Sequence, residues 1–330
     1  MNHSRSHHSV TQCTRWLLVA VFLFAAVESR AEPKIEFKPD NARGRMQILI
    51  GGQEALVYVF NTNVDLPHFF PVRSPAGKSM TVEQTEPYPH HRSFWFADTV
   101  QLEGQRQVSF YNALYSGAGD KKNPQPPFRD HVRHVAFTAQ NSGEGKAQLD
   151  AKLLWEMDHG KIPVLDESQQ MRVVAFGEGE YFLDLHYTLT ASYGDVTFRS
   201  DAVHYAWPFI RLNGDFSAKG GGVLVNSAGQ TGQTNTNMKA AQWVDFSRAG
   251  AKDADGLAMF SHPSNEQPHT WLTRDYGCIG PRRVDLKSGK PFVLKKGETI
   301  QTRVGVLVHK GDVKSGRIAE RYQAYVQGKL

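Results

Sequence analysis

Cysteine is scarce in this sequence. Only Cys13 and Cys278 occur among 330 residues, and Cys13 lies in an N-terminal segment that we expect to be removed. Cys278 would then be alone, which excludes an intramolecular disulfide. A chain of about 300 residues buries roughly three quarters of the surface that its unfolded state exposes, so a crosslink is not needed. We therefore expect a core that is stable by burial alone.

An excess of one charge is also missing. The chain has 38 Lys and Arg against 33 Asp and Glu, a net charge of +5, and loss of the N-terminal segment would reduce it to about +3. No block of like charges occurs. A nucleic-acid-binding protein usually concentrates Lys and Arg on one face. The composition therefore argues against nucleic acid as a partner.

Long apolar runs are absent except near the N-terminus. Residues 16–27 read WLLVAVFLFAAV, which is shorter than the roughly 20 apolar residues of a membrane-spanning helix. Arginines precede this run, and the small residues Ser29 and Ala31 follow it. The pattern predicts a signal peptide over residues 1–31, with export to the periplasm or the extracellular space. An uncleaved anchor is the alternative, and we expect no membrane span in the mature chain.

Motifs of the common cofactor and hydrolase sites are missing. The chain has no P-loop, no G-x-G-x-x-G after a strand, no G-x-S-x-G, no H-E-x-x-H and no C-x-x-C. The usual signatures of a nucleotide cofactor, a serine hydrolase and a zinc protease are thus not found. We predict no cofactor, while a divalent metal held by histidines from distant strands stays open.

The sequence does contain a series of strand patterns. Residues 181–191, YFLDLHYTLTA, alternate with the period of a half-buried strand. Residues 46–60 indicate a hairpin around two glycines, and residues 301–312 indicate another apolar strand. Gly, Asn and Asp recur as turn signals between such runs. We predict one all-β domain over residues 32–330, a large antiparallel β-sandwich, closed by a short C-terminal helix over residues 315–329.

A first candidate site lies in PYPHHRSFWFAD, residues 87–98. In an extended strand, neighbouring side chains point to opposite faces. His90 and Arg92 would then share one face, and His91 and Trp95 the other, unless the backbone turns before them. A polar head followed by aromatic rings suits a sugar ligand, because arginine offers fixed donors and histidine moves a proton near neutral pH. The alternative is a strand entrance with solvated cations over a buried aromatic core.

A second candidate segment, SHPSNEQPHTWLTRDYG, spans residues 261–277. Its two prolines indicate a loop, and loops on rigid β-scaffolds often carry function. The polar and aromatic side chains that a polyhydroxy ligand would need are His262, His269, Trp271, Arg274 and Tyr276. The alternative is a long connection whose polar groups satisfy its own backbone.

A third segment mixes acids and bases. It reads RDHVRH, residues 129–134, and Asp130 would orient His131 if the two side chains met, although neighbours on a strand diverge. His186 and His204 are lone histidines in strand patterns. A buried or surface position is favoured over a ligand role for both.

An ordered series of motifs resembles a bacterial family of secreted proteins labelled "methane oxygenase PmoA". The series comprises FFPVRSPAGKSMT, PHHRSFWF, RDHVRHVAF, WVDFS, HPSNEQPHTWLTRDYG and LKKGETIQTRVGVLVHKGD. The resemblance covers most of the mature chain. It implies a β-supersandwich related to galactose-mutarotase-like folds, whose members bind or rearrange sugars. The chain departs from the family where DAVHYAWPF, around His204, replaces a Lys-Glu-Gly stretch.

These observations favour an exported carbohydrate-active enzyme of lyase, hydrolase or epimerase type, acting on a saccharide or sugar derivative. Acid–base catalysis is assigned to His90, His262 and Tyr276. Binding of the substrate is assigned to His91, Arg92, Trp95, His131, His269, Trp271 and Arg274, with the two tryptophans as a stacking platform. A non-catalytic sugar-binding or scaffolding module is one alternative. A histidine-ligated metal oxygenase, the literal meaning of the family label, is another.

Overall fold

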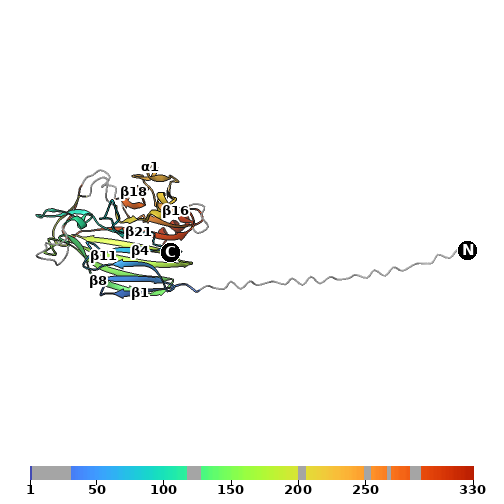
Figure 1. The fold of residues 1–330 in the computed structure, drawn as a ribbon, viewed down its shortest axis with the longest axis horizontal. Coiled ribbons are helices and arrows are strands. Elements are labelled where there is room, and N and C mark those ends of the chain that lie inside the picture. The colour runs from blue at the N-terminus through green and yellow to red at the C-terminus, as the bar shows by residue number, and fades with distance from the viewer. Residues whose placement is uncertain (2–30, 117–127, 200–205, 249–253, 266–268, 283–290) are drawn as a thin grey trace. The chain divides into compact units, whose positions relative to one another are not determined.

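The computed structural model describes residues 1, 31–116, 128–199, 206–248, 254–265, 269–282 and 291–330. Residues Glu32–Leu330 form one compact unit, whose regular secondary structure is mostly strands (Figure 1). Neighbouring strands in the described residues pair antiparallel throughout. The predicted all-β class, with a large antiparallel sandwich, is confirmed. Neither helix of the described residues is long and apolar enough to cross a membrane.

Two large sheets make up the sandwich in the described part of the chain. The nine-stranded sheet has the order β18 (Thr270–Arg274), β19 (Cys278–Arg282), β14 (Phe209–Arg211), β5 (Phe94–Trp95), β4 (His68–Val72), β3 (Gln53–Val59), β2 (Arg45–Ile50), β1 (Lys34–Asp40) and β9 (Gly143–Glu144). The eight-stranded sheet has the order β15 (Gly222–Asn226), β16 (Trp243–Arg248), β17 (Asp255–Ser261), β21 (Thr299–Lys310), β12 (Glu180–Thr190), β11 (Ile162–Gly177), β10 (Lys146–Met157) and β8 (His131–Asn141).

Smaller elements complete the unit. A four-stranded sheet has the order β20 (Phe292–Leu294), β13 (Val196–Phe198), β6 (Thr99–Leu102) and β7 (Gln107–Ser109). The helical elements are η1 (Ala113–Tyr115), η2 (Gly214–Phe216), η3 (Ala218–Gly220), α1 (Gly232–Thr236) and α2 (Ile318–Val326).

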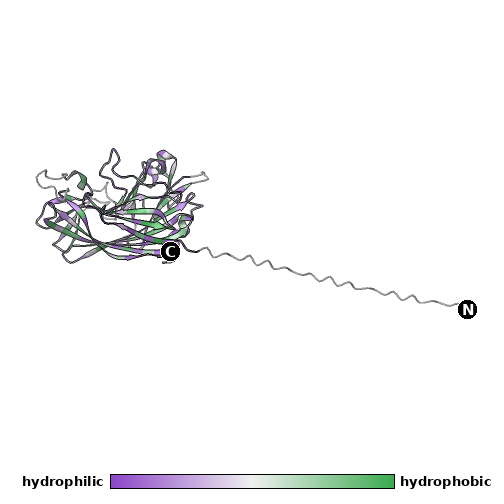
Figure 2. Cartoon of the chain, turned by 60° about the horizontal axis from the view of Figure 1, so that its bottom comes forward, coloured by the Kyte–Doolittle hydropathy of each residue, from purple (hydrophilic) through white to green (hydrophobic). Residues whose placement is uncertain are grey.

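The core lies between the two large sheets. Met46 and Phe94 come from the nine-stranded sheet, Val173 and Leu185 from the eight-stranded one, and all four belong to one buried cluster. Along the strands, hydrophilic and hydrophobic residues alternate (Figure 2), which is the pattern of strands with one face in a core. Burial of these side chains stabilises the sandwich without a crosslink, and Cys278 is a free, buried thiol.

The strongest sequence patterns are confirmed as strands. Residues 181–191 fall on β12, whose odd-numbered residues from Tyr181 to Leu189 are all buried. The hairpin predicted over residues 46–60 is formed by β2 and β3, and its two turn residues, Gly51 and Gly52, both have positive φ. Two-residue turns of this kind require such angles, which glycine adopts without strain.

The C-terminal helix is also confirmed. Helix α2 packs Tyr322 and Tyr325 against Phe182 and Phe260, which belong to the eight-stranded sheet. These residues form a second apolar cluster, separate from the main core. One side of the eight-stranded sheet therefore faces the core, and the other is partly covered by α2.

Candidate functional site

One cavity brings together residues from both main candidate segments. It has a volume of about 370 Å³, and we call it the His90–Tyr276 cavity. The described residues that line it are Tyr88, His90, His91, Tyr111, Asn112, Phe209, Leu272, Arg274, Tyr276 and Cys278. Segments far apart in the sequence thus meet at the end of the nine-stranded sheet where β14 separates β5 from β19 and β18.

A turn, rather than a strand, presents the two histidines. The Tyr88 N–H donates to Thr85 O at 3.0 Å, and the His91 N–H donates to Tyr88 O at 2.9 Å. Strand β5 begins only at Phe94. Strand alternation does not apply before that residue, so both imidazoles reach the cavity, with ring centroids 4.5 Å apart. The extended strand on which His90 and Arg92 would share a face is therefore not formed there, and the alternative of a turn applies.

His91 is the buried imidazole of the pair. Its ring stacks on Tyr88 at 4.9 Å, and its Nε2 lies 2.9 Å from the Tyr111 hydroxyl, within hydrogen-bonding distance. Burial, with smaller contributions from His90 and Arg211, lowers the pKa of His91 to about 3. At physiological pH this imidazole is neutral, so it can form hydrogen bonds but does not act as a general acid.

His90 is the more accessible of the two imidazoles. Its side chain is partly exposed, and its Nδ1 lies 3.0 Å from the Tyr115 hydroxyl. The ring also contacts Tyr111, with centroids 5.2 Å apart. Among the lining groups, His90 is therefore the better placed to exchange a proton with a ligand and with solvent.

Tyr276 and Arg274 also line the cavity, and a second arginine, Arg211, packs against Tyr276. The Arg211 guanidinium lies over the Tyr276 ring, 4.1 Å from its centroid, an attractive cation–π arrangement. Burial, followed by Cys278 and Tyr88, raises the pKa of Tyr276, so its hydroxyl stays protonated and can donate. Arg274 Nη1 donates to Asn237 Oδ1 at 2.7 Å and to Thr273 O at 2.9 Å. Both acceptors are neutral, so the charge of Arg274 is not compensated by them.

Arg92 was predicted to bind substrate, but the structure places it elsewhere. Its Nε and Nη2 donate to Asp65 Oδ1 at 2.8 and 2.5 Å, and its Nη1 lies 3.2 Å from Glu83 Oε1. The side chain is buried with 1% of its surface exposed. It does not line the His90–Tyr276 cavity, because two carboxylates hold it inside the protein.

The two predicted stacking tryptophans are both buried. Trp95 stacks on Phe209 at 5.0 Å, one layer behind the cavity wall. Trp271 is fully buried, and its Nε1 donates to Ala241 O at 2.8 Å. Neither offers a free face to a ligand. The aromatic surface of the cavity comes instead from tyrosines, of which Tyr88 and Tyr111 were missed, although Tyr88 stands next to the histidines in the sequence.

The remaining predicted histidines lie outside this cavity. His262 Nδ1 lies 2.7 Å from Ser264 Oγ, and its ring packs on Tyr325 at 5.2 Å. His269 lines another cavity, of about 380 Å³. His131 is buried, and its Nε2 lies 3.7 Å from a carboxylate oxygen of Glu156.

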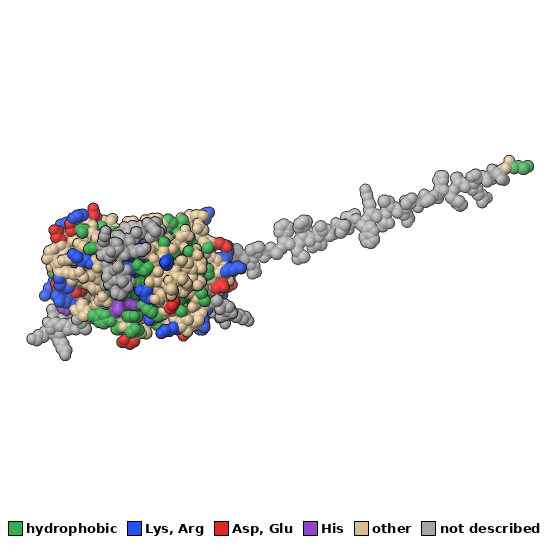
Figure 3. All heavy atoms as spheres, turned by 90° about the horizontal axis from the view of Figure 1, so that it is seen from above, with side chains coloured by type: hydrophobic (Ala, Val, Ile, Leu, Met, Phe, Trp, Pro, Cys, Tyr) green, Lys and Arg blue, Asp and Glu red, His purple; other side chains and the backbone are tan. Residues whose placement is uncertain are grey.

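No metal site is evident in the described residues, since none of their His, Cys, Asp and Glu side chains gather in groups of three or more that could hold an ion. His204, in the segment that departs from the resembled family, lies outside the described residues. On the face that Figure 3 shows, histidines reach the surface beside hydrophobic side chains, and charges of both signs are interspersed.

The fold and this cavity define an all-β sandwich with a histidine- and tyrosine-lined pocket on one of its two large sheets. Residues 45–323 match the model of a family described as a family of unknown function (DUF6807). The chain therefore belongs to this family. A comparison with curated proteins gave no match, and the resemblance to the PmoA-labelled proteins stays a prediction.

Solved structures with a similar fold include carbohydrate-active enzymes. The GH36 α-galactosidase AgaB of Geobacillus stearothermophilus is 9% identical with a TM-score of 0.50, over 86% of this chain and 42% of its own. The galactose 1-epimerase of Lactobacillus acidophilus NCFM is 11% identical with a TM-score of 0.34, over 84% of this chain and 98% of its own. The chain thus spans about two fifths of the α-galactosidase, and at this identity the likeness concerns the fold alone.

Proposed function

We propose that the protein is exported, binds a saccharide or sugar derivative in the His90–Tyr276 cavity, and acts on it by acid–base catalysis. The observation that carries this proposal is the convergence of His90, His91, Arg274 and Tyr276 in one cavity. They come from segments almost two hundred residues apart in the sequence. Such a polar and aromatic pocket on a rigid sheet is the usual form of a small-ligand site.

Each lining group has a role that its surroundings support. The tyrosine rings offer flat apolar faces for the C–H groups of a sugar. Arg274 supplies charged donors for hydroxyl or acidic oxygen atoms. His90 would accept or deliver the proton, while Tyr276, whose pKa is raised, would donate a hydrogen bond to an oxygen that gains negative charge. His91 is neutral and would orient the ligand.

The test compares variants that differ in their distance from the cavity. His90→Gln removes the proposed proton-transfer group, and Tyr276→Phe removes the hydroxyl proposed to donate to the developing negative charge. His262→Gln removes a histidine that the sequence predicts as catalytic but that does not line the cavity. Tyr193→Phe alters an exposed tyrosine elsewhere and serves as the matched control. The purified variants would be screened by thermal shift against neutral and acidic saccharides, and then assayed for turnover of any saccharide that binds.

We expect His90→Gln and Tyr276→Phe each to reduce turnover by about a hundredfold or more, the usual contribution of a positioned acid or base and of one donor to a developing negative charge, respectively. His262→Gln and Tyr193→Phe should leave it unchanged. If all four variants bind and turn over the saccharide like the unaltered protein, the proposal is wrong. If Tyr88→Ala and Tyr111→Ala abolish binding while His90→Gln has no effect, the protein is a binding module and not an enzyme.

A further inference from the structure

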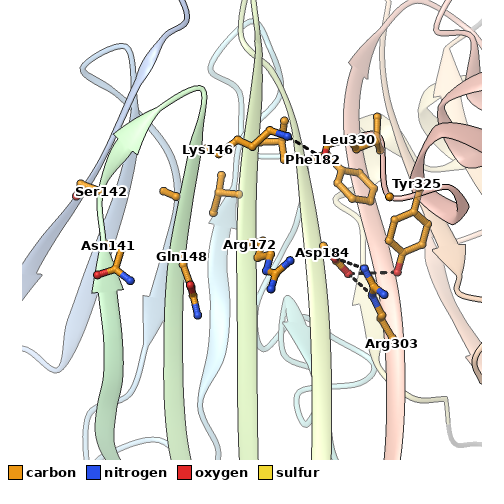
Figure 4. Close-up of a pocket in the computed structure, with 14 residues that line it drawn as sticks. Asn141, Ser142, Lys146, Gln148, Arg172, Phe182, Asp184, Arg303, Tyr325 and Leu330 are labelled. Carbon is orange, nitrogen blue, oxygen red and sulfur yellow. Dashed lines mark hydrogen bonds and ion pairs between the residues drawn. The ribbon is translucent and has the colours of Figure 1, made fainter.

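A second cavity, of about 440 Å³, opens on the eight-stranded sheet (Figure 4). It shares no lining residue with the His90–Tyr276 cavity among the residues described. Its floor is formed by strands β8, β10, β11, β12 and β21, and one of its walls by the end of the chain after helix α2. Nothing in the proposed function uses this cavity.

The register of the sheet places four polar side chains in one row across the cavity floor. Asn141 pairs with Gln148, Gln148 with Arg172, and Arg172 with Asp184. Figure 4 shows these four side chains side by side on successive strands. Strands lie about 4.8 Å apart, so the row extends over roughly 14 Å. This length exceeds that of a single sugar ring.

The row faces away from the core. The residue next to each of the last three members, Leu149, Val173 and Leu183, is buried in the main core, and side chains alternate along a strand. Helix α2 covers the same side of the sheet farther along, where Tyr325 packs on Phe182. The cavity lies at the boundary between the part of the sheet that α2 covers and the part that α2 leaves uncovered.

Arg172 is the one cation on this floor without a partner among the described residues. Asp184, its cross-strand neighbour, is already held by Arg303, whose Nε and Nη2 donate to its two oxygens at 2.9 and 2.6 Å. Tyr325 also donates to Asp184, at 3.3 Å. The Arg172 side chain is exposed and makes no hydrogen bond or ion pair with the residues described. Its charge is therefore available to a ligand.

The geometry points to a second binding site in this cavity, for an acidic saccharide whose carboxylate or sulfate ester is bound by Arg172. A guanidinium donates to either group in a bidentate manner. The amides of Asn141 and Gln148 provide donors and acceptors for the hydroxyl groups of the same ligand. That the ligand is a saccharide rests on the proposed function, whereas the need for an anion rests on Arg172.

The experiment compares two variants that each lose one positive charge. Arg172→Gln removes the cation of the row. Lys152→Gln removes an exposed lysine on the same strand face as Gln148, outside the cavity. Each variant and the unaltered protein would be titrated by calorimetry with trigalacturonate and with its methyl ester, which lacks the charge. A third probe is the sulfate ester of an otherwise neutral trisaccharide. Tyr276→Phe would be titrated in parallel.

We expect Arg172→Gln to weaken binding of an acidic trisaccharide by about tenfold or more, the loss expected for a charge-assisted hydrogen bond. Lys152→Gln should change this binding by less than about twofold. Binding that depends on Arg172 should be kept in Tyr276→Phe, because Tyr276 does not line this cavity. The methyl ester should bind as weakly to the unaltered protein as trigalacturonate does to Arg172→Gln. Whether the carboxylate or the sulfate probe shows this dependence identifies the anionic group.

Equal losses in Arg172→Gln and Lys152→Gln, or no binding of either acidic probe, would overturn the second site. A loss in Tyr276→Phe alone would overturn it too, and would leave the proposed function standing. If Arg172→Gln loses affinity for an acidic probe, and no saccharide is found whose binding or turnover depends on His90 or Tyr276, the second site is supported and the proposed function is overturned. Melting temperatures of the variants show whether each one is folded.

Discussion

Replacing Arg92 by methionine is expected to lower the free energy of unfolding by about 3–5 kcal/mol, the cost of leaving a buried charge without its partner. Arg92 holds Asp65 through two nitrogens, at 2.8 and 2.5 Å from Oδ1. Asp65 has 0% of its surface exposed, so water cannot replace the guanidinium. In the variant, Asp65 keeps only the hydrogen bond from the Leu66 N–H, at 3.0 Å.

The size of this loss should depend on pH. Burial raises the pKa of Asp65, and Arg92 opposes that rise. Without Arg92 the pKa of Asp65 rises further, so the folded variant takes up a proton at a pH where the unfolded chain does not. Stability of the variant then falls as the pH rises from the unfolded pKa towards the folded one. The loss relative to the unaltered protein should be smaller near pH 4 than near pH 7.

Urea unfolding followed by circular dichroism gives the free energy, and calorimetry gives the melting temperature. For a unit of about 300 residues, a loss of 3–5 kcal/mol corresponds to a decrease of about 5–8 °C. The double variant Arg92→Met, Asp65→Leu should recover most of the loss, because both charges are then absent. Arg317→Met, which breaks an exposed ion pair with Glu320, should leave stability unchanged.

The same variant tests the placement of Arg92 outside the candidate site. The folded Arg92→Met protein should bind any saccharide found for the His90–Tyr276 cavity with unaltered affinity, because Arg92 does not line it. A variant that unfolds like the unaltered protein but loses this binding would refute the reasoning. Arg92 would then belong to the ligand site, as the sequence predicts.

Three further predictions concern other buried groups. His309 Nε2 lies 2.8 Å from Asp245 Oδ2. Burial lowers the pKa of His309, but Asp245 and the Lys310 carbonyl together outweigh it, so the pKa is raised above its usual value of 6.5. This pair should stabilise the fold fully below about pH 6.5 and lose its contribution as the pH rises through the folded pKa. In urea unfolding, Asp245→Asn should remove this decrease of the free energy of unfolding with pH. The pKa of His91 is about 3, so its ring signals in NMR spectra should not move between about pH 5 and pH 8. A Cβ added at Gly305 would lie 2.5 Å from the ring of Phe182, so Gly305→Ala should cost about 1–3 kcal/mol in urea unfolding, and a second change, Phe182→Leu, should relieve part of it.

The sheets could be predicted because their signals are local. Residues 181–191 alternate in polarity, and residues 46–60 carry two glycines at the point where φ must be positive. Each pattern needs only a few neighbouring residues to be read. The order of strands in the sheets is not local. β5 lies between β4 and β14, and no pattern near Phe94 indicates that Ile210 will be its cross-strand partner.

The candidate site could be predicted only in part, for the same reason. Both segments that contribute to it stood out by their residue types, and four of the side chains predicted from them meet in one cavity. The direction of each side chain could not be predicted from the sequence, because the turn before β5 depends on backbone hydrogen bonds from Tyr88 and His91. Tyr111, which supplies part of the wall, belongs to neither segment and carries no motif.

Arginines show most clearly why residue type alone cannot assign a binding role. Arg92 and Arg303 are each neutralised by carboxylates in the folded chain. Arg274 donates to an amide and a backbone oxygen, and Arg172 makes no polar contact with the described residues. Because an arginine that already has a carboxylate partner gains little from a second anion, Arg274 and Arg172 are, of these four, the ones with charge to offer a ligand. They lie in different cavities on different sheets, so an acidic saccharide that binds this protein should lose affinity on replacement of one of these two arginines and not of Arg92 or Arg303.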